Sequence, residues 1–569
     1  MRTLRGINFL KTLTFLAGAG LLTSMSAARD FARFDWVDYR NVEKGPAAGA
    51  QHYRNPVIAG YYPDPSVVRV GADFYLVNSS FSWFPGLPVW HSRDLVHWRQ
   101  IGNAIDRKGQ LDFTGIGMSM GTFAPDISHH DGLFYIVNTC VACGGNFVIT
   151  ARDPKGPWSD PVWLKTVDGI DPSLFFDDDG SAWLVHNAGP KGAPRYNGHT
   201  AIWLTRFDPK TLQAVGEAKV IVDAGVDPTK NPVWIEGPHL FKKDGTYYLM
   251  AAEGGTAENH SEVIFRSDTV EGPYVPAPAS VNPILTQRDL DPARKDPITS
   301  SGHADLVKTE TGDWWAVFLA TRPYQGGLYN TGRETFLAHV TWADGWPTIL
   351  PHGTPIPVIA RAPALPHDAA PPVTGSFAAR DDFAGKQLGP EWMMMRSPTT
   401  AWYRLEGGAL VLAARSERLG DGKQPSFLAR RQQSAEAVVT TSLRFAPAEG
   451  EEAGLAALQN DHYFLSIALA RKDRTLAVEV LRRAGPNDPA GGVVVASKPV
   501  AAGAVQLRIH ARGGLYDFDY AVTPGHWLTV AHDVDATNLS TAKAGGFVGT
   551  LIGPYAQSSV GASAAAIRQ

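Results

Sequence analysis

Three acidic residues, Asp64, Asp171 and Glu236, lie far apart in the sequence but in similar surroundings. Each stands within two residues of a proline, just before a short apolar stretch. A single acid in such a place is usually a turn residue at the start of a strand. Three acids in equivalent places could instead form one site, in which one carboxyl keeps its proton while another has lost it. A protonated and an ionised carboxyl on either side of a bond are what hydrolysis of a glycosidic bond requires.

The acids belong to a sequence pattern that recurs five times. Each copy has a polar or small residue, often with proline, then apolar residues, a short turn that usually contains glycine, and an aromatic-rich strand. The copies begin at Asp64, Ala124, Asp171, Gly237 and His303. Each copy starts with a β-hairpin pattern, and none has a long helical period. Five such repeats predict a five-bladed β-propeller with inserted loops.

In a propeller the first strand of each blade lines the central axis, so the residues that lead these strands meet at one end of it. Asp64, Asp171, Glu236 and His303 would therefore gather in one funnel. Burying like charges together is unfavourable unless the group has a task. Glu236 follows Trp234 and Ile235, and apolar neighbours raise a carboxyl pKa, which suits Glu236 as the general acid. Asp64 suits the general base, and Asp171 adds a negative charge that keeps Glu236 protonated.

Length and composition limit the class of protein. A chain of 569 residues predicts two or three domains. Aromatic residues make up 10% and charged residues only 19%, which favours a β-rich protein with stacking surfaces. The net charge of −4 gives no electrostatic reason to expect nucleic acid or an anionic membrane as partner. Nothing in the sequence indicates an oligomeric state.

The first segment, residues 1–28, has the pattern of a signal peptide. Arg2 and Arg5 precede an apolar core at about residues 13–22, and small residues follow at 26–28. This pattern predicts a secreted or periplasmic protein, and an uncleaved anchor is the alternative. The two cysteines, Cys140 and Cys143, are either a short-loop disulfide or a pair of free thiols.

The rest of the chain divides into two β-domains, so the predicted fold class is all-β. We expect the propeller at residues 29–358, with residues 29–54 packed across it. Residues 359–374 are rich in proline and alanine, which predicts an extended linker. Alternating strands broken by turn residues predict a β-sandwich at residues 375–558. The small and polar residues 559–569 are expected to be disordered.

Aromatic residues near the acids could stack on a sugar. Phe81 follows the first hairpin, and Phe123 directly precedes Ala124 on the expected axis. Trp83 and Phe84 are either further stacking surfaces or part of a core.

Several motifs resemble those of glycoside hydrolase family 43, and in particular its β-xylosidase and α-L-arabinofuranosidase branch. The resembling segments are residues 55–58, 62–66, 171–174 and 236–240. Residues 426–432 and 452–455 resemble the concanavalin-A-like sandwich that this branch carries at its C-terminus. The resemblance covers most of the mature chain.

What the resemblance implies is an inverting exo-hydrolase. It gives Asp64 the role of general base, Asp171 that of pKa modulator and Glu236 that of general acid. It places Phe81 and Phe123 in the aromatic walls of the first sugar subsite. Tryptophan is common at the second of these positions, so Phe123 is a departure that could alter sugar preference.

Three further residues match family positions. Arg333 matches an arginine that contacts sugar hydroxyls and the modulating acid. His303 matches an axial histidine that holds a calcium ion or a water in some members, so calcium in the central channel is an option although no cofactor is required. Phe547 lies either in a sandwich loop that closes the pocket or in the sandwich core.

The expected substrate is a xylo-oligosaccharide or an arabinosylated oligosaccharide, from which the enzyme releases terminal β-D-xylose and also α-L-arabinofuranose. The sequence does not rank the two sugars, because both offer nearly the same hydroxyl geometry to a shallow pocket. A dedicated arabinofuranosidase is the alternative enzyme. A carbohydrate-binding propeller without catalysis is the alternative outside the enzyme class.

Overall fold

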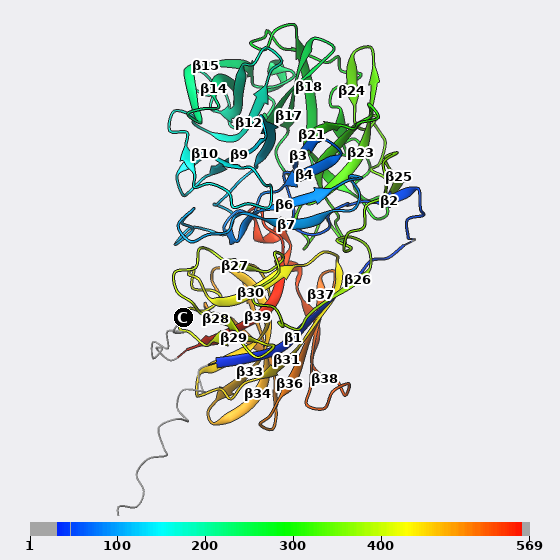
Figure 1. Cartoon of the computed structure of the whole chain (residues 1–569). Helices are drawn as coiled ribbons and strands as arrows, with labels where there is room; N and C mark the ends of the chain where they lie inside the picture. Colours follow the sequence, from blue (N-terminus) through cyan, green and yellow to red (C-terminus); the bar gives the residue numbers. More distant parts are fainter. Residues whose placement is uncertain (1–30, 46, 560–569) are drawn as a thin grey trace, which may run out of the picture.

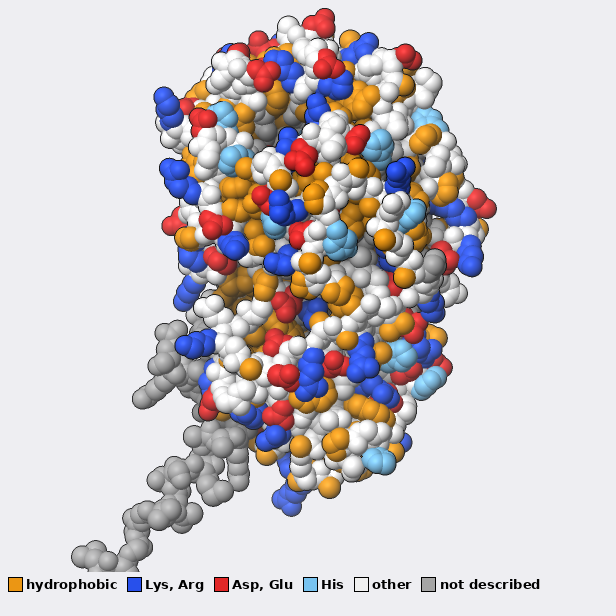
Figure 2. Space-filling model, turned by 45° about the vertical axis from the view of Figure 1, so that its right-hand side comes forward, with side chains coloured by type: hydrophobic (Ala, Val, Ile, Leu, Met, Phe, Trp, Pro, Cys, Tyr) orange, Lys and Arg blue, Asp and Glu red, His pale blue; other side chains and the backbone are white. Residues whose placement is uncertain are grey.

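The computed structural model describes residues 31–45 and 47–559, whose regular secondary structure is almost entirely β-strand. The predicted signal peptide and the predicted tail beyond Ser559 lie outside the described residues. Figure 1 shows a propeller above a sandwich. No described helix has the length and the apolar character that crossing a membrane requires. Acidic and basic side chains alternate over the face shown in Figure 2.

The upper domain is a five-bladed propeller, as predicted. Each blade is an antiparallel sheet built around four strands. They follow one another in the chain, except that β5 (Trp83–Phe84) of the other domain comes between the second and third strands of the first blade, and the fourth blade carries β20 (Leu285–Thr286) in addition. The strands are β3 (Ser66–Val70), β4 (Asp73–Val77), β6 (Gly86–Ser92) and β7 (Arg99–Ile105); β8 (Asp126–His130), β9 (Leu133–Cys140), β10 (Gly145–Ala151) and β11 (Val162–Trp163); β12 (Ile170–Phe176), β13 (Ala182–Ala188), β14 (Ala201–Asp208) and β15 (Gln213–Asp223); β16 (Glu236–Lys243), β17 (Thr246–Glu253), β18 (Ser261–Ser267) and β19 (Val275–Pro276); β21 (Thr299–Lys308), β22 (Trp314–Thr321), β23 (Glu334–Ala343) and β24 (Trp346–Thr348).

The lower domain is a sandwich of two eight-stranded sheets, and its concanavalin-A-like character agrees with the prediction. One sheet has the order β28, β29, β1, β31, β36, β37, β38, with β26 also paired to β1; the bounds are β28 (Tyr403–Leu405), β29 (Leu410–Ala413), β1 (Phe31–Val42), β31 (Glu436–Arg444), β36 (Val505–Arg512), β37 (Leu515–Ala521), β38 (Leu528–Asp535) and β26 (Phe377–Asp381). The other has the order β35, β34, β33, β32, β39, β30, β27, β5; the bounds are β35 (Val493–Pro499), β34 (Thr475–Ala484), β33 (Tyr463–Lys472), β32 (Glu451–Asn460), β39 (Leu551–Ser558), β30 (Ser426–Arg431), β27 (Met393–Met395) and β5 (Trp83–Phe84).

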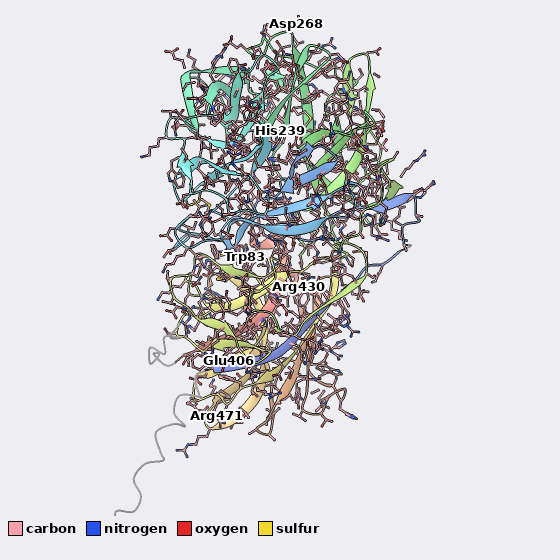
Figure 3. The ribbon with its side chains drawn as sticks, viewed as in Figure 1. Trp83, His239, Asp268, Glu406, Arg430 and Arg471 are labelled. Carbon is pink, nitrogen blue, oxygen red and sulfur yellow. A yellow bond between two sulfur atoms is a disulfide. The ribbon has the colours of Figure 1, made fainter. Side chains whose placement is uncertain are left out.

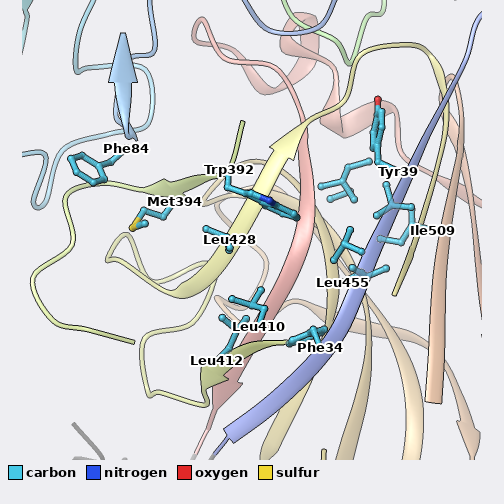
Figure 4. Packing of buried hydrophobic residues seen from close by; sticks show 14 of the residues in the cluster. Phe34, Tyr39, Phe84, Trp392, Met394, Leu410, Leu412, Leu428, Leu455 and Ile509 are labelled. Atoms are coloured by element: carbon cyan, nitrogen blue, oxygen red, sulfur yellow. The ribbon is translucent and has the colours of Figure 1, made fainter. Parts of the chain in front are cut away.

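The predicted boundary between the domains was wrong at the N-terminal end. Residues 31–42 do not pack across the propeller but form β1, which lies inside a sandwich sheet between β29 and β31. Figure 4 shows Phe34 and Tyr39 of β1 pointing into the same core as Leu455 and Ile509. A bulge between Phe34 and Trp36 breaks the alternation of buried and exposed side chains, which hid the strand in the sequence.

The two domains share strands as well as surfaces. Trp83 and Phe84 form β5, which pairs with β27 of the sandwich, so both residues are buried at the junction (Figures 3 and 4). Arg322 of the propeller binds Glu334 and also Glu43 at 2.8 Å, just after β1. This part-buried pair joins the two domains in addition to the shared strand pairing.

The predicted linker is not a free spacer. Its first residues form β25 (Ile359–Arg361), which pairs with β2 (His52–Arg54). Further along, Leu365 and Val373 pack against an apolar cluster shared by the first and fifth blades. The linker is therefore docked along the propeller before the chain enters the sandwich.

Candidate active site

The backbone turns in the same way at four of the five repeat positions. Asp64, Asp171, Gly237 and His303 have φ values of 51°, 54°, 55° and 51°. In blades three, four and five these residues coincide with interruptions of the strand register. A bulge with a left-handed residue aims its neighbours away from the regular pleat. The repeated bulge thus delivers the leading side chains to one end of the channel.

Asp64 is buried, with 4% of its surface exposed, and is held by two donors. Arg333 Nη1 donates to Asp64 Oδ1 at 2.9 Å, and the Ser79 hydroxyl donates to Oδ2. His303 Nδ1 lies 3.9 Å from Asp64 Oδ1. A carboxylate has about four lone-pair directions, and these donors do not fill all of them. Asp64 can therefore still accept a hydrogen-bonded proton from a bound water.

Asp171 is joined to the strand that carries Glu236. The backbone N–H of Gly237 donates to Asp171 Oδ2 at 3.1 Å. Gly237 also lies against the His303 ring, since a Cβ at this glycine would be 2.8 Å from it. Only glycine therefore lets the Glu236 strand approach the axis this closely.

The pKa values of the acids move in the direction that acid catalysis needs. Burial, and then the charges of Asp171 and Asp64, raise the pKa of Glu236 to about 8, against the opposing effect of Arg333. Burial and the charge of Asp64 likewise raise the pKa of Asp171. Burial lowers the pKa of His303 to about 4, so its ring is neutral at neutral pH. With this pKa Glu236 keeps its proton at neutral pH, which is the state that a general acid needs.

Three aromatic rings from both domains meet beside Arg333. Phe547, from a loop of the sandwich, stacks on Phe81 with centroids 5.6 Å apart, and Phe123 meets both edge-on. The Arg333 guanidinium lies 5.5 Å from the Phe547 ring and 5.9 Å from the Phe81 ring. Phe81 is only 1% exposed, so the free aromatic surface comes from the half-buried Phe123 and Phe547. Phe547 thus lies in a loop of the sandwich that contacts the propeller, and its role in closing the pocket stays a prediction.

The eight predicted site residues are therefore brought together, but a second ring of side chains was missed. It lies two residues further along each first strand and consists of Ser66, Asp126, Ser173, His239 and Asp305. Figure 3 marks His239 in the middle of the propeller. Since alternate residues of a strand share a face, the spacing of the repeats could have revealed this ring.

This second ring ties the blades together. His239 Nδ1 lies 3.5 Å from Asp126 Oδ1 and 3.8 Å from Asp305 Oδ1. Burial by itself would lower the pKa of His239, but Asp305 and Asp126 raise it to about 9. The imidazole of His239 therefore carries a positive charge at neutral pH. Asp126 and Asp305 also accept hydrogen bonds from Ser66 of the first blade.

Calcium in the central channel stays a prediction. Asp126, His239 and Asp305 could surround a cation, whereas His303 belongs to no such group within the described residues. However, Asp126 Oδ2 accepts from Leu174 N at 3.0 Å, and the two oxygens of Asp305 accept from backbone N–H groups at 2.8 Å. In this arrangement the positive charge of the His239 ring balances the two carboxylates.

Two smaller contacts were also missed. Ser79, which donates to Asp64, follows β4 in a run of polar residues, and no pattern in the sequence places that run in the interior. Ser119 accepts a hydrogen bond from the backbone N–H of Phe547 at 2.9 Å and so fixes the sandwich loop to the propeller. Cys140 and Cys143, left open between thiols and a disulfide, are paired.

Comparison with known proteins gives matches over both domains. The family model of glycosyl hydrolases family 43 matches residues 53–347, and that of the beta xylosidase C-terminal concanavalin A-like domain matches residues 380–567. A xylosidase/arabinosidase of Butyrivibrio fibrisolvens is 37% identical over 89% of this chain and 95% of its own length.

Two further proteins are similar over nearly their whole length. The non-reducing end alpha-L-arabinofuranosidase BoGH43B of Bacteroides ovatus is 38% identical over 89% of this chain and 91% of its own. The crystal structure of a GH43_12 protein from a capybara gut metagenome superposes with a TM-score of 0.86 at 37% identity, covering 92% of this chain and 99% of that one.

Proposed function

The chain belongs to glycosyl hydrolases family 43 and is a glycoside hydrolase, and from this premise we propose that it releases terminal β-D-xylose, and also α-L-arabinofuranose, from hemicellulose oligosaccharides. The observation that carries the proposal is that two carboxyl groups share one buried site. Glu236 is the proton donor, and Asp64 is a carboxylate held by Arg333.

The two carboxyl groups divide the reaction between them. Glu236 gives its proton to the glycosidic oxygen while the bond from that oxygen to the anomeric carbon breaks. Asp64 takes a proton from a water, whose oxygen forms the new bond to the anomeric carbon from the opposite side. The configuration at that carbon is therefore inverted. Asp171 holds the Glu236 strand through Gly237 N–H and adds negative charge beside the acid.

The shape of the site favours attack at a chain end. Phe547, Phe123 and Phe81 form an aromatic wall beside Arg333. We infer that this wall stops the chain on one side, so that the site takes one terminal sugar. The names of the two relatives, a xylosidase/arabinosidase and an arabinofuranosidase, support pentoses as the substrate class.

A dedicated arabinofuranosidase is the second candidate, because BoGH43B carries that name. The test is release of 4-nitrophenol from its β-D-xylopyranoside and its α-L-arabinofuranoside, with the Asp64→Asn variant as the blank. We expect release from both, and the xyloside should give α-D-xylose as first product by proton NMR. Release from the arabinofuranoside alone would favour the second candidate, and release from neither would overturn the proposal.

We also propose that the protein is exported. The charged and apolar pattern of residues 1–28 supports this, as does the Cys140–Cys143 disulfide, since disulfides persist in oxidising compartments. N-terminal sequencing of the mature protein is the test. Cleavage near residue 28 is expected, and an intact Met1 in the mature protein would contradict the proposal.

A further inference from the structure

Trp234 is the most exposed tryptophan of the described chain, with 46% of its surface accessible, and it stands two residues before Glu236. Its φ of 49° is left-handed, which is an outlier for a bulky side chain. Backbone strain of this kind persists only where the surroundings enforce it, and it concentrates at functional sites.

Glycines on two loops make room for the indole. A Cβ on Gly255 would come within 2.6 Å of the six-membered ring, and one on Gly198 would lie 3.4 Å from Nε1. The backbone N–H of Trp234 donates to the backbone oxygen of Gly198 at 2.8 Å, and the backbone N–H of Gly254 donates to that of Val233 at 3.0 Å. The ring is therefore fixed against the protein on one side while nearly half of its surface stays open.

The indole is supported by other blades than those that carry the aromatic cluster beside Arg333. Two residues of chain span at most about 7 Å, so Trp234 is roughly one sugar ring away from the acid. Its supporting loops belong to blades three and four. Phe81, Phe123 and Phe547 gather instead near Arg333 and Asp64, on the side of blades one and two and the sandwich.

We propose that Trp234 is the binding platform for the leaving-group sugar, a pentose or short pentose oligosaccharide. The general acid protonates the oxygen that departs with the leaving group, so that group must lie on the Glu236 side. An open, rigid indole offers a flat apolar face to the C–H groups of a sugar ring, at little cost in side-chain entropy. This inference rests on the proposed function.

The experiment compares two substrates that differ only in the leaving group. Xylobiose leaves a sugar on the platform, whereas β-D-xylopyranosyl fluoride leaves fluoride and needs no platform. For Trp234→Ala we expect kcat/KM for xylobiose to fall by about tenfold or more, while that for the fluoride changes less than about twofold. The same comparison is made with arabinosylated xylotriose and α-L-arabinofuranosyl fluoride.

Three further variants serve as controls for this experiment. Trp234→Asn suits the left-handed backbone, so it covers the case in which the alanine variant does not fold. Trp234→Phe restores a flat ring and should recover part of the xylobiose activity. Val275→Ala removes a 58% exposed apolar side chain from the same blade and should change neither substrate.

Equal losses of kcat/KM on both substrates, or unchanged xylobiose hydrolysis, would overturn the proposal that Trp234 binds the leaving-group sugar. A wild-type enzyme that cleaves neither pair of substrates would overturn the proposed function and this inference together. The two failures are thus told apart by the wild type alone.

Discussion

Phe547 of the sandwich stacks on Phe81 of the propeller, with ring centroids 5.6 Å apart and planes 19° from parallel. The contact joins residues more than 460 positions apart in the sequence and makes the second domain part of the active site. The sandwich is therefore not an appendage that could be removed without effect on catalysis.

Replacing Phe547 tests this relationship. Phe547→Ala should lower kcat/KM for a xyloside or arabinofuranoside by about 10-fold to 100-fold, because the pocket loses one wall and admits water. The melting temperature should change little, since the ring is only half-buried. Steady-state kinetics and a thermal melt check both expectations, with Val495→Ala, on an exposed part of the sandwich, as control. Unchanged kinetics would mean that the ring does not shape the pocket.

The two carboxyl groups should respond differently to the quality of the leaving group. Glu236→Gln removes the proton donor, so kcat on xylobiose should fall by about 10²-fold to 10⁴-fold. Hydrolysis of a dinitrophenyl xyloside should fall much less, because its leaving group needs no proton. Asp64→Asn should abolish turnover of both substrates. If Asp64→Asn instead lost activity mainly on xylobiose, while Glu236→Gln lost activity on both substrates, the two residues would have the opposite roles.

The pH profile should report the proton on Glu236. Since the pKa of this carboxyl is raised to about 8, the acid form is present below that pH and is lost as the pH rises through it. The alkaline limb of kcat/KM should therefore fall near pH 8. Asp171→Asn removes a neighbouring negative charge and should move this limb to lower pH. A limb that stays in place in Asp171→Asn would remove Asp171 from the role of modulator.

Gly237 should be irreplaceable for a steric reason. A Cβ at this position would lie 2.8 Å from the His303 ring, so Gly237→Ala must displace the Glu236 strand or the ring. We expect a loss of activity of about 100-fold or more. Gly245→Ala is the matched control: it lies in the same blade and also has a positive φ of 83°, but nothing is within 4 Å of its Cβ. Equal losses in the two variants would assign the effect to backbone strain.

Glu262 should make stability depend on pH. This glutamate is fully buried, its Oε1 has no hydrogen-bond partner in the described structure, and burial raises its pKa to about 8. The folded protein keeps this proton while the unfolded chain releases it near pH 4.5, so the stability that Glu262 contributes is full below that pH and is lost as the pH rises to about 8.

Glu262→Gln should flatten this dependence, since glutamine does not titrate. Between pH 5 and pH 8 the variant should lose less free energy of unfolding than the wild type, by on the order of 1–3 kcal/mol. Urea unfolding at several pH values is the measurement. The exposed Glu217→Gln should follow the wild type. Parallel curves for wild type and Glu262→Gln would show that the carboxyl does not titrate in this range.

The sequence by itself determined the propeller and most of the site. A strand repeats its side-chain direction every two residues, and the five leading residues recur before equivalent strands, so their meeting at the axis follows from local pattern alone. The same spacing also predicts that His239, Asp126 and Asp305 meet, because each lies two residues after a leading residue. The motifs of the family identified Arg333 and His303 in addition.

Only the tertiary structure decided what depends on the choice of distant partners. Tyr39 of β1 pairs with Val439, and Phe547 reaches Phe81, yet neither sequence neighbourhood specifies its partner. Trp234 is likewise open because glycines on two other loops make room for it. The physical reason is the same in each case: strand edges and aromatic faces are generic, and which of them meet is settled by the packing of the whole chain rather than by local preference.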